Sequence, residues 1–136
     1  MRILVDTSVW IEFFRSRSGL SQDLLDFLSL TLEDDRVVTI YPIQAEILSG
    51  SLLPHKEKEI REAFESMTHI DLSWNEKNTW DRLVEMAQVA RKASLRIPGI
   101  VDRMILGAAE KEGVSLWTHD AALAELAKKL DVHLFP

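Results

Sequence analysis

Short apolar runs alternate with longer segments of helical periodicity along this sequence. The run at residues 3–5 is typical of a strand buried on both faces, those at 37–40 and 114–117 predict short strands, and 69–72 and 132–135 are weaker strand candidates. Helical spacing of apolar residues predicts helices over 9–15, 21–32, 43–49, 100–111 and 121–130, after residue 54 and after residue 76. This alternation predicts an α/β fold, a three-layer α/β/α domain with a mostly parallel sheet.

Two of the predicted helices carry finer expectations. Ser73 and Glu76 have the spacing of a capping box before the long helix. The buried stripe of that helix is expected to comprise Trp80, Leu83, Val84, Ala87 and Ala90. On the first helix we expect core packing for at least two of three aromatic residues, with partner contacts as the alternative: Trp10, Phe13 and Phe14.

Composition narrows the class of protein. A chain of 136 residues is most simply one domain, residues 1–136. Its apolar runs are far shorter than the roughly 20 residues of a membrane span, no signal-peptide pattern begins the chain, and cysteine is absent, so we expect a cytoplasmic protein without membrane contact. The net charge of −6 argues against a general nucleic-acid coat protein but leaves a metal-dependent nuclease open.

Two aspartates follow predicted strands. Asp6 ends the run at residues 3–5, and Asp120 lies in a hydroxyl-containing turn after residues 114–117, each directly before a helix. Ligands of open α/β sheets bind at the carboxyl ends of strands. Aspartate is also a common turn and capping residue, so either residue alone leaves both roles open.

Two further acids lie on predicted helices. Glu46 falls beside the apolar stripe of its helix, where an unpaired charge either reaches to water or meets a ligand. Asp102 falls in a first helical turn, where it could simply complement the helix dipole. Capping does not explain acids at two separate strand ends, so the four together favour a site for Mg²⁺ or Mn²⁺, which prefer carboxylate oxygens and water.

Four sequence blocks around these acids resemble the motifs of PIN-domain ribonucleases, and within them the VapC-like toxins of bacterial and archaeal toxin–antitoxin pairs. The blocks are residues 3–11 with Asp6, 42–50 with Glu46, 100–109 with Asp102, and 113–120 with Thr118 and Asp120. Their order and approximate spacing agree with the family across almost the whole chain. Two features depart from it: Arg103 replaces a small or apolar residue, and residues 51–75 carry no family signature.

The resemblance implies a metal-dependent endoribonuclease acting as the toxin of a type II toxin–antitoxin system. Asp6, Asp102 and Asp120 would hold one or two Mg²⁺ ions, for which Mn²⁺ could substitute, and Glu46 would complete the acidic pocket. A water activated by the metal would hydrolyse an RNA phosphodiester bond. The resemblance also implies a VapB-like antitoxin that covers the site, and a homodimer.

Neighbouring polar residues have supporting roles in this hypothesis. Thr7, Ser8 and Thr118 could orient the carboxylates, or could act only as helix caps. We interpret His119 as a surface turn residue. Basic residues that could neutralise RNA phosphates, unless they are merely solvated, are Arg15, Arg17, Arg91, Lys92, Arg96 and Arg103.

Other protein classes fit less well. A haloacid-dehalogenase-like phosphatase would carry a second aspartate two residues after the first, where this chain has Ser8. A response-regulator receiver would have an adjacent acidic pair after its first strand, which this chain lacks. The remaining alternatives are a PIN-fold nuclease of RNA processing outside a toxin–antitoxin pair, and a catalytically silent PIN-fold binding module, which has no need of all four acids.

Overall fold

The predicted buried strands pair side by side in a parallel sheet. In the computed structural model, which describes residues 2–15, 26, 29, 35–50 and 54–136, four strands follow the order β3-β2-β1-β4. They are β1 (Ile3–Val5), β2 (Val37–Thr39), β3 (Thr68–His69) and β4 (Ser115–Trp117). Every pairing is parallel, and Ile3 in the centre lies opposite Val37 on one side and Ser115 on the other.

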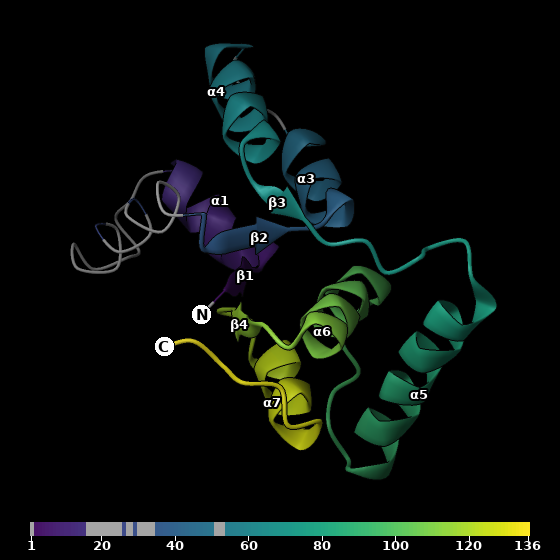
Figure 1. The fold of residues 1–136 in the computed structure, drawn as a ribbon. Coiled ribbons are helices and arrows are strands. Elements are labelled where there is room, and N and C mark those ends of the chain that lie inside the picture. Colours follow the sequence, from purple (N-terminus) through teal and green to yellow (C-terminus); the bar gives the residue numbers. More distant parts are fainter. Residues whose placement is uncertain (1, 16–25, 27–28, 30–34, 51–53) are drawn as a thin grey trace.

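Six helices of the described chain cover this sheet. They are α1 (Thr7–Arg15), α3 (Tyr41–Leu48), α4 (Pro54–Glu65), α5 (Lys77–Lys92), α6 (Ile100–Glu112) and α7 (Ala121–Lys129). In Figure 1, α3 and α4 lie at the top next to β3, α1 lies beside β2, α6 and α7 lie in the lower part near β4, and α5 lies outside α6. The predicted α/β fold with a parallel sheet between helical layers is therefore confirmed, while the helix expected over 21–32 lies almost entirely outside the described residues.

The hydrophobic core is formed largely by the strands that the continuous apolar runs predicted. All residues of β1, β2 and β4 are buried, as expected for strands covered on both faces. Trp10 of α1 is fully buried, stacked on Phe14 and edge-on to Phe64. Phe13 and Phe14 are partly buried against the same core, so the aromatic residues of α1 pack mainly inward.

Some local expectations were wrong. The capping box does not form, because Ser73 has a left-handed backbone (φ 59°) and α5 begins only after Glu76, which makes no side-chain cap. The buried face of α5 consists of Leu83, Met86 and Ala90, whereas Trp80 and Val84 are exposed. The last predicted strand is reduced to a single parallel bridge between Leu116 and Leu134.

The strand order alone indicates where in the sheet a ligand site is expected. The chain runs from β1 outward to β2 and β3, then returns to place β4 on the other side of β1. The carboxyl ends of β1 and β4 therefore flank the point where the strand order reverses, which is where open α/β sheets bind ligands. Among the described residues, no helix has the length and apolarity that a membrane span requires.

Candidate active site

Asp6 occupies the carboxyl end of the central strand β1 and is almost fully buried, with 2% of its surface exposed. Its Oδ2 accepts hydrogen bonds from the hydroxyls of Ser8 and Thr118, both at 2.7 Å. Its Oδ1 is buried and has no hydrogen-bond partner within the described part of the chain. A buried carboxylate oxygen without a donor is costly, so Asp6 is oriented by one oxygen while the other is left for a ligand.

Asp120 follows β4 and is tied to Asp6 through Thr118. The Thr118 hydroxyl donates to Asp6 and accepts the backbone N–H of Asp120 at 3.0 Å. Oδ1 of Asp120 accepts the N–H of Leu123 at 2.8 Å, so Asp120 is also the N-cap of α7. The backbone N–H of His119 reaches the Ser8 hydroxyl at 3.0 Å, which joins the ends of β1 and β4 a second time.

Glu46 comes to the same edge from α3. Its side chain is exposed, and Oε1 accepts a 2.7 Å hydrogen bond from the hydroxyl of Thr7, the first residue of α1. Thr7, Ser8 and Thr118 thus each donate to one of the four acids, as a residue orienting a carboxylate must. Thr7 also connects α1 with α3, two helices that pack together.

Asp102 brings the fourth carboxylate from the first turn of α6. Burial, together with the negative charges of Asp6, Asp120 and Glu46, raises its pKa from 3.8 to about 6. The other three predicted acids therefore lie within electrostatic reach of Asp102, although the four come from four segments of the chain. A cluster of like charges that shifts a pKa is a feature of functional sites.

The donor set suits a hard divalent cation. Carboxylate oxygens are the ligands that Mg²⁺ and Mn²⁺ prefer, and the unpartnered Oδ1 of Asp6 is a free ligand atom among them. In the described chain, no three acidic, histidine or cysteine side chains lie in an arrangement that could by itself hold a metal ion. Mg²⁺ usually keeps several waters and needs only one or two carboxylates, so the residues fit a cation that is attracted by their negative charge and bound partly through water.

Comparison with known proteins identifies the family. The family model of the PIN domain matches residues 3–129, nearly the whole chain. The chain belongs to the PIN-domain family. Ribonuclease VapC11 of Mycobacterium tuberculosis is 25% identical over 126 residues, which cover 93% of this chain and 92% of that protein.

Solved structures agree with this assignment at the level of the fold. The PIN domain matches VapBC2 from Rickettsia felis bound to a DNA fragment from their promoter, with a TM-score of 0.73, 17% identity, and coverage of 99% of this chain and 98% of that chain. It matches FitAcB from Neisseria gonorrhoeae with a TM-score of 0.68, 21% identity, and coverage of 98% and 96%. The described topology is thus that of known PIN-domain structures.

The basic residues that were considered for RNA binding differ in their surroundings. Arg103 donates from Nε to the carbonyl of Pro98 at 3.1 Å and from Nη1 to that of Leu83 at 2.9 Å, so its guanidinium connects α6 to the preceding loop and to α5. Arg91, Lys92 and Arg96 are exposed at the end of α5 and in the following loop. Arg17 and the side chain of Arg15 lie outside the described residues.

Two side-chain pairs at this edge of the sheet could not be predicted from the sequence alone. Nδ1 of His119, an exposed turn residue as expected, lies 3.2 Å from Oε2 of Glu12. Glu12 is four residues after Ser8 on α1, and this helical spacing is the signal that could have placed it near the site. The ring of Tyr41 stacks on that of His69, a contact for which no sequence pattern exists.

Proposed function

We propose that this PIN domain is a Mg²⁺- or Mn²⁺-dependent endoribonuclease that hydrolyses RNA phosphodiester bonds. The observation that supports this most directly is the meeting of four carboxylates at the switch point of the sheet, where burial and mutual repulsion raise the pKa of Asp102 to about 6. The similarity to Ribonuclease VapC11 over nearly the full length of both chains supports RNA as the substrate.

The residues divide into cation ligands and their supports. Asp6, Asp102 and Asp120 would hold the cation, and Glu46 would complete the negative pocket. When bound, the cation lowers the pKa of a water molecule and stabilises negative charge on the phosphate. Ser8 and Thr118 keep Oδ2 of Asp6 in place, so that Oδ1 is presented to the ligand in one orientation.

We also propose that the enzyme is the toxin of a type II toxin–antitoxin system, held by a VapB-like antitoxin and acting as a homodimer in the cytoplasm. The support is again similarity: the solved structures that share this fold include VapBC2 of Rickettsia felis and the DNA-bound VapBC of Salmonella typhimurium. Co-expression with the product of the neighbouring reading frame, followed by co-purification, tests the antitoxin.

Cleavage of structured RNAs in the presence of Mn²⁺ tests the nuclease function. We expect the wild-type protein to cut and the Asp6→Asn variant to lose at least about 100-fold in rate, because even residues that only orient metal ligands contribute about 10- to 100-fold. Circular dichroism should show a folded variant, since asparagine has the size of aspartate and can still meet both hydroxyls.

Asp131→Asn is the matched control for that substitution. Asp131 is exposed after α7 and has a left-handed backbone (φ 58°), a conformation that asparagine also tolerates. This variant should cut RNA at the wild-type rate. An inactive wild-type protein, or equal activity in wild type and Asp6→Asn, would refute the nuclease function and favour a silent binding module.

A further inference from the structure

An exposed aromatic ring lies at the same carboxyl edge of the sheet as Asp6, over the end of β3, which β2 separates from β1. Tyr41 begins α3 directly after β2, and 65% of its surface is exposed. Leu4 of β1 lies opposite Val38 of β2, and this register, continued by two residues, places Ile40 beside Asp6. Neighbouring strands are about 4.8 Å apart, so Ile40 lies on the strand next to Asp6, and Tyr41 follows Ile40 in the chain.

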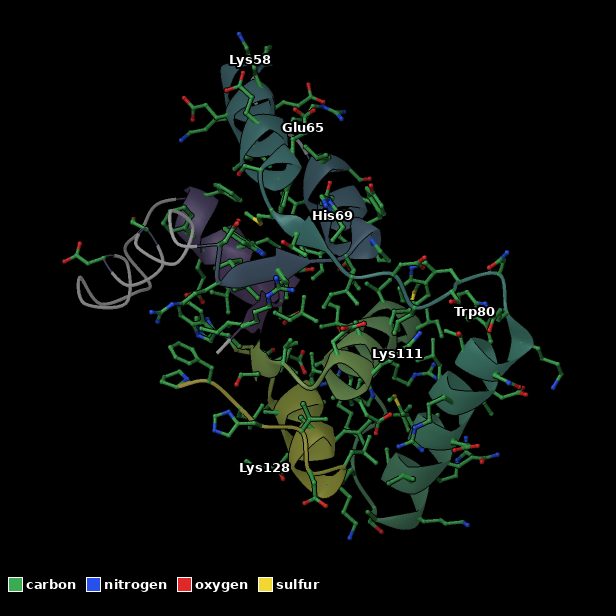
Figure 2. All side chains as sticks on the ribbon, in the orientation of Figure 1. Lys58, Glu65, His69, Trp80, Lys111 and Lys128 are labelled. Atoms are coloured by element: carbon green, nitrogen blue, oxygen red, sulfur yellow. The ribbon has the colours of Figure 1, made fainter. Side chains whose placement is uncertain are left out.

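One face of the Tyr41 ring is supported by a second ring. Tyr41 stacks on the ring of His69, the last residue of β3, with centroids 4.6 Å apart and an angle of 26° between the planes. The amide of Gln44, also on α3, contacts Nε2 of His69, and Figure 2 shows His69 beside this helix. One face of the Tyr41 ring is therefore supported, and its large exposed area leaves the opposite face to solvent.

A fixed and exposed ring at the same edge of the sheet as the four acids suits a nucleobase. Without a bound cation the acids repel phosphate, and of the six basic residues considered for RNA, Arg103 is engaged with backbone carbonyls. Stacking requires no positive charge, and every base offers a π face, which is why single-stranded RNA is commonly held on aromatic side chains. A ring that is already held by His69 loses little conformational freedom when a base binds.

We propose that Tyr41, supported by His69, is the platform on which a base of single-stranded RNA stacks next to the phosphate held at the acids. This inference rests on the proposed nuclease function and adds a substrate-positioning residue to it. Tyr41 touches a neighbouring base and not the reacting atoms, so its loss should raise KM more than it lowers kcat.

Binding of an oligoribonucleotide of about ten nucleotides, carrying 2-aminopurine at successive positions, tests the platform. The measurement uses Mn²⁺ and the Asp102→Asn background, so that the RNA stays intact. We expect Tyr41→Leu to weaken binding roughly 5- to 100-fold and to lose 2-aminopurine quenching at one position. Tyr41→Phe, which keeps the ring, should bind within about twofold of the parent and retain the quenching.

Trp80→Leu is the matched control for removal of an exposed aromatic ring. Trp80 lies on α5, far from α3 and His69 in Figure 2, and its replacement should leave binding and quenching unchanged. A wild-type protein that cuts RNA, together with a Tyr41→Leu variant that binds and quenches like its parent, overturns the platform and leaves the nuclease function intact. A wild-type protein that neither binds nor cuts RNA overturns both.

Discussion

Asp102 has a pKa that is raised by burial and by the negative charges of the other three acids. It is half-buried, and three other carboxylates oppose its ionisation. Its pKa of about 6 means that a large fraction of Asp102 is protonated at mildly acidic pH, where an isolated aspartate is fully ionised. In the absence of a cation, the native protein therefore binds a proton that the unfolded chain does not.

This extra proton predicts the direction in which stability changes with pH. Between the ordinary pKa of 3.8 and the folded value of about 6, the native state holds more protons than the unfolded state, so stability rises as pH falls. Without divalent ions, the free energy of unfolding should increase from about pH 7.5 to about pH 5 by on the order of 1 kcal/mol after allowance for solvent screening. Urea denaturation at a series of pH values measures the change.

The Asp102→Asn variant isolates the contribution of this carboxyl group to the pH dependence. Asparagine does not titrate, so the variant should show a smaller rise in stability on acidification than the wild-type protein. Asp131→Asn, which removes an exposed carboxylate elsewhere, should keep the wild-type dependence. Parallel curves for wild type and Asp102→Asn would contradict the raised pKa.

At the scale of elements, α5 and α6 pack closely because a glycine lies between them. A Cβ on Gly107 of α6 would come within 3.1 Å of Leu83 and 3.4 Å of Leu72. Arg82 of α5 bridges to Glu110 of α6 through two hydrogen bonds of 2.8 and 2.6 Å. Asp102 is therefore presented by a helix that is fixed along one side.

Arg103 should stabilise this helix pair and not bind RNA. Arg103→Met removes the donors to the carbonyls of Pro98 and Leu83, and we expect a loss of about 1–3 kcal/mol in unfolding free energy. Replacement of Arg91, Lys92 and Arg96 by glutamate should change stability far less, because these side chains are exposed. Urea denaturation and the salt dependence of RNA binding separate the two groups.

The salt dependence of RNA binding distinguishes Arg103 from the exposed cluster Arg91, Lys92 and Arg96 most clearly. Each phosphate that the exposed cluster no longer neutralises should reduce the magnitude of the negative slope of log K against log salt by about 0.7 for single-stranded RNA. A normally stable Arg103→Met variant with a reduced slope would place Arg103 on the RNA. An unchanged slope in the triple variant would remove Arg91, Lys92 and Arg96 from the RNA surface.

The sequence predicted those elements whose environment is set by the chain itself. Residues 3–5 read as a buried strand because the run is apolar without interruption, and α6 ends at Gly113, whose left-handed backbone (φ 65°) is a common helix stop. The face of α5 was predicted only in part, since Leu83 and Ala90 are buried as expected but Trp80 and Val84 are exposed. The buried side depends on the neighbouring helix, because Leu83 and Met86 pack against Gly107. No pattern within α5 carries that information.

The acids were easier to foresee than their surroundings for a similar reason. Parallel strands bring their carboxyl ends to one edge, so a parallel sheet places Asp6 and Asp120 at the same edge. That β1 and β4 are neighbours there follows from the strand order, which the sequence did not predict. The pairs Tyr41–His69 and Glu12–His119 depend on side-chain contacts between distant segments. Helical spacing after Ser8 could have placed Glu12 near the site, but spacing along the chain does not identify the histidine that either residue meets. The periphery of a site therefore requires a structure even where its centre does not.

At the scale of the whole molecule, a chain with a net charge of −6 gathers four acids at one edge of its sheet, and that edge should couple cation binding to stability. A ligand that binds only the native state at about 100 times its Kd adds about 2.7 kcal/mol, which corresponds to a rise in Tm on the order of 10 °C for a chain of this size. Thermal unfolding with Mn²⁺ or Mg²⁺, against sodium chloride at equal ionic strength, should show this rise in the wild-type protein and in Asp131→Asn. Asp6→Asn, which loses the buried ligand oxygen, should show only the small effect of charge screening. Equal shifts in wild type and Asp6→Asn would mean that the cations merely screen the surface.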